Sequence, residues 1–253
     1  MTDSPEKRTH FTPIQLLPNM VTIVAICAGL SAIRFGVQGD FVIAVKLIIL
    51  ACVLDGLDGL LARLLSSDSK IGAELDSLAD FLNFGVAPPL IIYFWALQDM
   101  SRAGWVAVLV FAVCCVVRLA RFNVNSKAVD EHSPCPKNAY FTGVPSTAGA
   151  PLVLLPMFVS FAFVDTPQMP DLFICIYMIL VGLAMISRIP TLSLKSMRIS
   201  PDNVKFFLVG FAIFGAAALT YAWITMVVLC FGYIGTIFWC LLVKPTPKMS
   251  KEN

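Results

Sequence analysis

This chain contains about eight apolar segments. Several are ~20 residues long, the length with which a helix crosses the hydrocarbon core of a bilayer. The chain is 58% hydrophobic and only 13% charged, whereas an ordinary soluble domain is roughly a quarter charged. We therefore expect an all-α polytopic membrane protein rather than a soluble domain with one anchor. The expected spans are Pro18–Val37, Phe41–Leu65, Gly72–Leu97, Ala103–Arg121, Thr142–Val164, Leu172–Arg188, Val204–Tyr221 and Trp223–Val243.

The basic residues predict the orientation of these spans. If the chain starts inside and crosses eight times, most of its 18 Lys and Arg residues lie on the cytoplasmic side. The exceptions are Arg34 and Arg102 outside and Lys46 within the second span. Because cytoplasmic loops carry the excess of positive charge, we expect both termini, residues 1–17 and 244–253, in the cytoplasm. The same orientation places the loop Ser66–Ile71 inside.

Four aspartates stand in the second and third spans, where a carboxylate costs a few kcal/mol even on insertion scales. Asp55 and Asp58 are three residues apart, and Asp76 and Asp80 are four apart, so each pair shares one helix face. On two facing helices the four carboxylates would repel one another unless a multivalent cation lay between them. All four lie in the half of their span that we expect to be cytoplasmic.

The neighbouring residues suggest what this cation binds. Hard oxygen ligands favour Mg²⁺, Mn²⁺ or Ca²⁺, and two such ions would polarise a phosphoryl group. Gly59 and Ala62 remove bulk beside the carboxylates, and Gly72 leaves room on the facing span. Arg63 lies one turn further, where its guanidinium can grip a phosphate. These residues predict a pocket for a metal-bound phosphate ester.

The same residues resemble the signature of the CDP-alcohol phosphatidyltransferases, and every position of that motif is filled. It reads Asp55-x2-Asp58-Gly59-x2-Ala62-Arg63-x8-Gly72-x3-Asp76-x3-Asp80. Further strings are similar to the bacterial phosphatidylserine synthases, the branch of the family that uses serine. These strings are LLPNMVTI, DSLADFLNFGVAP, RLARFN, FTGVP and SRIPTLSLK.

This resemblance implies phospholipid biosynthesis: transfer of a phosphatidyl group from CDP-diacylglycerol to L-serine, giving phosphatidylserine and CMP. It implies two divalent ions, Mg²⁺ or Mn²⁺, with Asp80 as a ligand and the general base on the serine hydroxyl. The other implied metal ligands are Asp55, Asp58 and Asp76, and the implied CDP-diacylglycerol contacts are Gly59, Ala62, Arg63 and Gly72.

The resemblance also implies an architecture and a setting. We expect a six-helix family core over residues 18–198, followed by a pair of helices over residues 199–243. We further expect a homodimer in the bacterial inner membrane, with membrane lipids around it, the active site facing the cytoplasm, and no nucleic-acid partner.

Recognition of serine is expected to involve Asn83, Arg118 and Arg121. The two arginines share a helix face, and either can pair with the amino-acid carboxylate or extend to lipid headgroups. Asn83 lies on the face of Asp76 and Asp80, where it can contact a substrate or bond a neighbouring helix.

Other functions stay open from the sequence. The same chemistry can use glycerol 3-phosphate, inositol phosphate or choline as the acceptor. From a different class, membrane acids can form a divalent-cation transporter. That alternative predicts acids distributed along a path, whereas these cluster at one depth beside Arg63, which would repel a transported cation.

Overall fold

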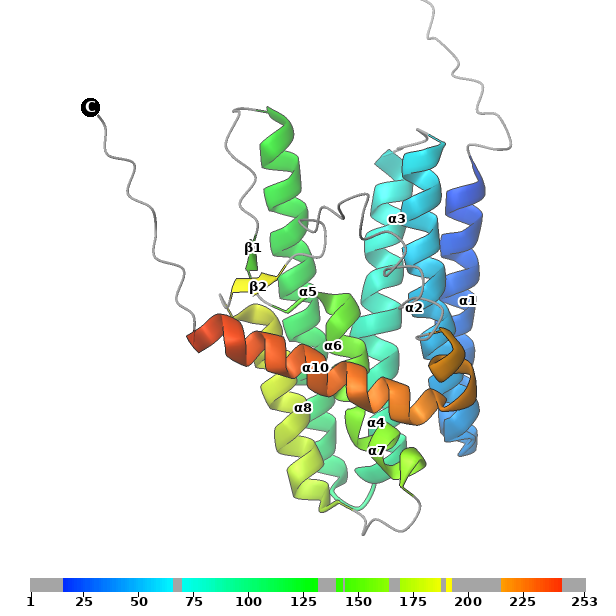
Figure 1. Ribbon diagram of the computed structural model, residues 1–253, viewed down its shortest axis with the longest axis vertical. Coiled ribbons are helices and arrows are strands. Elements are labelled where there is room, and N and C mark those ends of the chain that lie inside the picture. The colour runs from blue at the N-terminus through cyan, green and yellow to red at the C-terminus, as the bar shows by residue number, and fades with distance from the viewer. Residues whose placement is uncertain are drawn as a thin grey trace, which may run out of the picture.

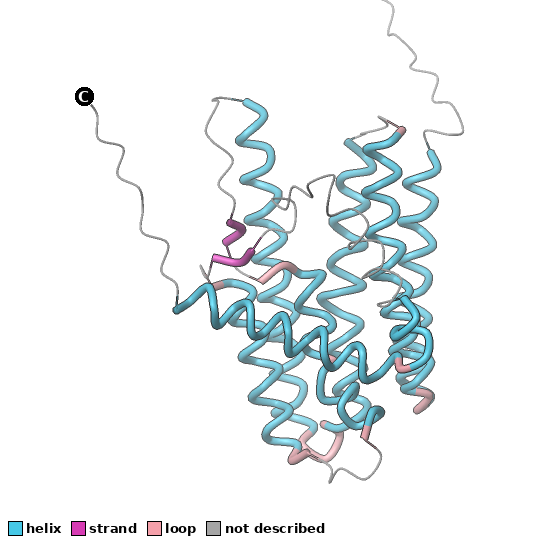
Figure 2. Tube along the Cα trace, viewed as in Figure 1, coloured by secondary structure: helices cyan, strands magenta, loops and turns pink. Residues whose placement is uncertain are grey.

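The computed structural model describes residues 16–65, 70–131, 140–142, 144–163, 169–187, 190–192 and 215–242. These residues are helical apart from short connections and one pair of three-residue strands (Figures 1 and 2). Among these described residues, four helices are long and apolar enough to cross a membrane: Leu17–Gln38, Ile71–Ala96, Ser101–Val124 and Ala222–Trp239. The prediction of an all-α polytopic membrane protein is confirmed.

The first two helices form an antiparallel pair that packs closely along its length. α1 spans Leu17–Gln38 and α2 spans Phe41–Leu64. They are joined at Gly39, whose φ of 87° lies in the left-handed region that glycine adopts at little cost. The Asp40 N–H then bonds the carbonyl of Phe35 at 3.0 Å, which ends α1 sharply. This turn sets α2 beside α1 and fixes the helix that carries Asp55 and Asp58.

The third span is one continuous element with a widened turn in its middle. It consists of α3, Lys70–Asp80, the π-helix η2, Phe81–Val86, and α4, Ala87–Ala96. The Ala87 N–H reaches back to the carbonyl of Leu82, five residues earlier. Pro88 and Pro89 follow at once, and neither can donate to the preceding turn. The helix accommodates these prolines with a π-turn, directly after Asp80.

Two predicted spans differ from the structure in their bounds. α5, Ser101–Glu131, continues past the expected end at Arg121. The span expected at Thr142–Val164 is instead two short helices, α6, Ser146–Val153, and α7, Leu155–Ala162. Pro151 inside α6 and Pro156 in the first turn of α7 remove backbone donors on either side of the break. The prediction of one unbroken helix here was wrong.

A short strand pair joins two segments that are far apart in the sequence. β1, Tyr140–Thr142, pairs antiparallel with β2, Pro190–Leu192, with Phe141 opposite Thr191. β1 precedes α6, and β2 follows α8, Asp171–Ile186. The pair brings Phe141 of the string FTGVP beside Thr191 of the string SRIPTLSLK, near the C-terminal end of α10 (Figure 1).

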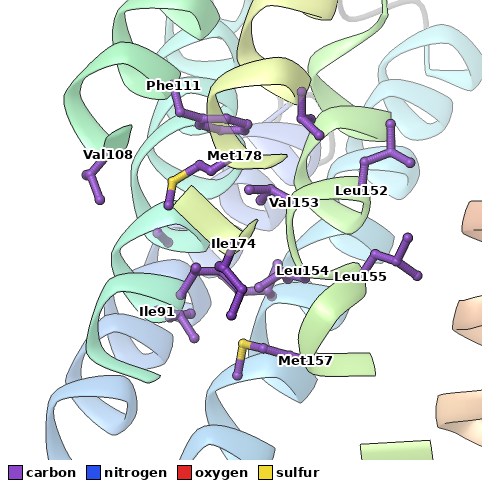
Figure 3. Packing of buried hydrophobic residues seen from close by; sticks show 14 of the residues in the cluster. Ile91, Val108, Phe111, Leu152, Val153, Leu154, Leu155, Met157, Ile174 and Met178 are labelled. Atoms are coloured by element: carbon purple, nitrogen blue, oxygen red, sulfur yellow. The ribbon is translucent and has the colours of Figure 1, made fainter. Parts of the chain in front are cut away.

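The core lies between α4, α5, α6–α7 and α8. Figure 3 shows Phe111 and Met178 meeting there, with Ile174, Leu154 and Ile91 further along. In contrast, many large apolar side chains on the outside are exposed, among them Leu30, Val113 and Leu180. Such a surface is suited to contact with lipid tails, because the tails are as apolar as these side chains and the contact buries no polar group.

The last described helix, α10, Ala222–Leu242, lies across the bundle rather than along it (Figure 1). It packs on α7, α6 and β2, and Trp223 contacts the ring of Phe161 with centroids 5.0 Å apart. Its bounds match the eighth expected span, but hydropathy did not predict this direction. The seventh expected span, Val204–Tyr221, lies mainly outside the described residues.

Candidate active site

Three of the four aspartates come together between α2 and α3. One carboxylate oxygen from each of Asp55, Asp76 and Asp80 lies within 4.8 Å of the others. Asp55 and Asp80 are partly buried, whereas Asp76 is exposed at the mouth of the group. The facing arrangement expected from the i, i+3 and i, i+4 spacings is therefore present for these three.

Asp58 is held by a different partner. It is 4% exposed, and its Oδ2 accepts a hydrogen bond of 2.5 Å from the hydroxyl of Thr22 on α1. The Thr22 hydroxyl also lies 3.0 Å from the carbonyl of Pro18. Thr22 was not among the site residues predicted from sequence, although it belongs to the string LLPNMVTI. The contact orients Asp58 from the first helix.

The donor set fits a hard divalent cation. The oxygens Asp58 Oδ1 and Asp80 Oδ1 are buried and accept no hydrogen bond from the described residues. Buried carboxylate oxygens without donors are costly, and three neighbouring carboxylates also repel one another. A cation bound by oxygen ligands would offset both costs, and carboxylates are the ligands that Mg²⁺ and Mn²⁺ prefer.

The space beside the carboxylates is open on the side of α2. A Cβ added to Gly59 would meet no atom within 4 Å, and Gly59 is exposed. Arg63 turns back along the helix, so that its Nε donates to the carbonyl of Gly59 at 2.9 Å. Ala62 and, on α3, Gly72 are half-buried. This geometry leaves room for a bulky group against the backbone of α2, with a guanidinium beside it.

Asn83 and Arg118 both present unsatisfied polar atoms inside the bundle. Asn83, in the π-turn, is fully buried, and neither its Oδ1 nor its Nδ2 has a partner among the described residues. Its amide packs directly against Gly29 of α1, where a side chain would collide with it. Arg118 donates from Nη1 to the hydroxyl of Ser146 at 2.9 Å, while its buried Nε has no partner.

Arg121 lies elsewhere, although it shares a helix face with Arg118. It is exposed, and its Nη1 donates to the carbonyl of Ile186, the last residue of α8, at 3.0 Å. A guanidinium in this position caps orphan carbonyls of the helix end. Glu74 is exposed and lies outside the carboxylate group, because it stands two residues before Asp76 and therefore on the other side of the helix.

A second contact missed from sequence ties α3 to α5. The side-chain amide of Asn123 donates to the hydroxyl of Ser77 at 3.0 Å. Ser77 directly follows Asp76, and Asn123 ends the string RLARFN. The bond therefore fixes the helix that carries Asp76 and Asp80 against its neighbour.

An apolar pocket of about 360 Å³ opens next to the carboxylates, between α2, α6 and α10. Cys52 on α2, one turn before Asp55, lies in its wall. The other lining residues include Val53, Thr147, Leu152, Met226 and Leu229. The polar site and an apolar pocket are thus adjacent on one helix.

Comparison with known proteins matches these residues to one family. The model of the CDP-alcohol phosphatidyltransferases matches residues 15–187, a stretch that contains all four aspartates.

Named relatives extend the match over most of the chain. A CDP-diacylglycerol–serine O-phosphatidyltransferase of Mycobacterium leprae is 37% identical over 234 residues, covering 92% of this chain and 77% of its own. Proteins of the same name from Mycobacterium tuberculosis and Helicobacter pylori are 35% and 34% identical. These cover 87% and 78% of this chain, and 76% and 78% of their own lengths. The chain belongs to the CDP-alcohol phosphatidyltransferase family.

Proposed function

We propose that this protein transfers the phosphatidyl group of CDP-diacylglycerol to L-serine, giving phosphatidylserine and CMP. The observation that carries the proposal is the group formed by Asp55, Asp76 and Asp80 beside the open face of Gly59. The choice of serine is supported by the names of the relatives, which match 78% to 92% of the chain.

The proposal includes a divalent metal, Mg²⁺ or Mn²⁺, as two ions held by Asp55, Asp58, Asp76 and Asp80. When bound, the metal would polarise the phosphoryl group and neutralise charge on the departing CMP. Thr22 supports this role because it fixes the orientation of Asp58, as outer-shell partners do for metal-binding carboxylates.

Asp80 is the proposed general base. A serine hydroxyl is a poor nucleophile until its proton is removed. Asp80 is partly buried, and a carboxylate has two oxygens, so one can bind the metal while the other accepts the proton. Asp55 and Asp76 lie close by and would hold the phosphate group of the donor through the metal.

The lipid donor fits the two kinds of space at the site. Gly59, Ala62, Arg63 and Gly72 are proposed to line the CDP moiety, with the Arg63 guanidinium beside its phosphates. The apolar pocket that begins at Cys52 would take part of an acyl chain. A donor with a charged head and apolar tails needs both surfaces to adjoin.

We further propose that the site and both termini face the cytoplasm of a bacterial inner membrane. The distribution of Lys and Arg along the sequence supports this orientation, and cytoplasmic serine would then reach the site directly. Assembly as a homodimer is proposed from the family resemblance.

The alternatives differ in what they require. An acceptor that carries its own phosphate, such as glycerol 3-phosphate or inositol phosphate, calls for extra basic residues near the aspartates; choline calls for none. A cation transporter calls for acids spread along a path, but Asp55, Asp76 and Asp80 gather at one point.

The decisive experiment is an assay of the purified protein in detergent with CDP-diacylglycerol. Labelled serine, glycerol 3-phosphate, inositol phosphate and choline are offered in turn, with and without Mg²⁺ or Mn²⁺. We expect labelled phosphatidylserine and an equal amount of CMP with serine and metal only. If product forms only with another acceptor, that acceptor and not serine is the substrate. If no acceptor gives a product, the assignment as a phosphatidyltransferase is wrong.

A further inference from the structure

Ser146 is a buried polar residue that the proposed chemistry does not use. Only 2% of it is exposed, and its hydroxyl accepts the hydrogen bond from Arg118 Nη1 at 2.9 Å. Ser146 is the first residue of α6, whereas Arg118 lies on α5. The bond therefore links two elements of the core through side chains.

The backbone around Ser146 is held firmly. Pro145 precedes it in an extended conformation, and the carbonyl of Pro145 accepts bonds from Ala148 and Gly149 at 3.0 and 2.9 Å. The N–H of Val144 bonds the carbonyl of Ala184 on α8 at 3.4 Å. The Ser146 hydroxyl thus occupies a fixed place, from which it can orient a neighbouring side chain.

Arg118 is only partly satisfied by this contact. Its Nε is buried and has no partner among the described residues, and Asp80 is near enough to interact with its charge. A neutral hydroxyl stabilises a guanidinium less than a carboxylate does, because a carboxylate is charged and can accept two parallel N–H hydrogen bonds. Arg118 therefore retains capacity for an anionic group close to Asp80.

The π-turn supplies further unsatisfied polar atoms in the interior of the bundle. η2 packs against both α5 and α6, and a Cβ on Gly85 would lie 2.9 Å from the sulfur of Cys115, one turn before Arg118. Asn83 in this turn has a donor and an acceptor without partners. Buried polar atoms of this kind are rare and call for a ligand or a functional explanation.

We propose that Ser146 is a positioning residue that holds the Arg118 guanidinium beside Asp80, where it pairs with the α-carboxylate of the acceptor amino acid. The inference rests on the proposed function, because only an amino-acid acceptor brings that carboxylate. It makes the Ser146–Arg118 pair the element that distinguishes serine from alcohols without a carboxylate.

The test measures acceptor kinetics for Ser146→Ala, with L-serine and L-serinamide as acceptors. Serinamide keeps the hydroxyl and the amine but replaces the carboxylate by a neutral amide. In Ser146→Ala, KM for serine should rise about tenfold, because one bond to a charged group is lost. The KM for CDP-diacylglycerol should stay within about twofold, and the preference for serine over serinamide should fall about tenfold. Ser146→Thr, which keeps the hydroxyl, should restore the preference.

Tyr177→Phe is the matched control. The Tyr177 hydroxyl donates to the carbonyl of Leu152 on α6 at 2.7 Å, so this variant also removes a bond that ties α6 to a neighbouring helix. It should leave the serine preference as in the wild type. Arg118→Lys, which keeps the charge but loses the planar fork, provides a second route to the same loss of preference if Ser146→Ala folds poorly.

The outcomes separate the two proposals. Wild-type protein that makes no phosphatidylserine would overturn the proposed function and this inference with it. Wild-type protein that uses serine, combined with an unchanged serine preference in Ser146→Ala and Arg118→Lys, would overturn the positioning role alone. An equal rise in KM for serine, serinamide and CDP-diacylglycerol would also overturn the positioning role, because it would indicate a general structural role.

Discussion

Thr22 on α1 donates a hydrogen bond of 2.5 Å to Asp58 on α2, across 36 positions of sequence. Both side chains are 4% exposed, so water does not compete for the contact. The first helix thereby takes part in the site without contributing an acid.

Thr22→Val should weaken metal binding while keeping the volume of the side chain. Loss of an outer-shell partner typically reduces metal affinity 10- to 100-fold, so we expect the Mg²⁺ concentration for half-maximal rate to rise at least about tenfold. A metal titration of the initial rate measures this shift. Thr225→Val, which removes an exposed hydroxyl bonded to the carbonyl of Tyr221, should leave the titration unchanged.

Asp80→Asn should abolish turnover and leave the binding of CDP-diacylglycerol largely intact. The amide keeps the shape of the side chain but cannot accept the serine proton, and general-base catalysis is worth about 10²- to 10⁴-fold. Rates and donor binding are measured on the same preparation. A rate near that of the wild type would show that another group accepts the proton.

Removal of divalent metal with EDTA should stop the reaction. Mg²⁺ or Mn²⁺ should restore it and Zn²⁺ should not, because the carboxylate oxygens of Asp55, Asp76 and Asp80 are hard ligands without sulfur or nitrogen. The measurement is the initial rate after dialysis and readdition of each ion. Full activity in EDTA would contradict the metal-dependent mechanism.

Gly59→Ala should lower activity by blocking substrate access without lowering the stability of the fold. A Cβ at Gly59 meets no protein atom within 4 Å, so stability should rise by about 0.5–1 kcal/mol, the usual gain of Ala over Gly in a helix. Activity should nevertheless fall at least about tenfold, since a methyl group would enter the space proposed for CDP.

Gly56→Ala is the control for that variant. Gly56 lies on the same helix, three residues earlier, and its added Cβ is equally unobstructed. It should gain similar stability with normal activity. Equal activity in both variants would mean that the donor does not approach α2 at Gly59.

Met226→Trp should fill part of the apolar pocket between α2, α6 and α10. If an acyl chain enters there, the KM for a long-chain CDP-diacylglycerol should rise while that for a short-chain analogue stays near the wild-type value. Comparison of the two donors at saturating serine checks this. An identical effect on both donors would place the acyl chains elsewhere.

The helical membrane fold was predictable from sequence, and of the four acids that were expected to meet, Asp55, Asp76 and Asp80 do. Apolar segment length indicates spans, and the spacing of Asp76 and Asp80 places them on one face. Thr22 and Ser146 gave no such signal. A single hydroxyl in an apolar run is common, and its partner, Asp58 or Arg118, is chosen only when distant helices pack.

The remaining differences have equally physical causes. The break between α6 and α7 was signalled by Pro151 and Pro156, but the apolar run around them suggested one span. The strands at Phe141 and Thr191 are too short to show alternation, so only their pairing reveals them. The direction of α10 depends on what it packs against, because hydropathy fixes the length of a helix and not its tilt.

The π-turn at Phe81–Val86 also has a consequence for how relatives align. A helix rotates by roughly 100° per residue, and a π-turn accommodates one extra residue in the span. Deleting that residue would keep Asp76 and Asp80 in place but swing Ile91 and Ile92 from the core toward lipid. Relatives without the Pro88–Pro89 pair are therefore expected to align with a single-residue gap in this span. The gap would lie between the half that carries Asp76 and Asp80 and the half that carries Ile91 and Ile92.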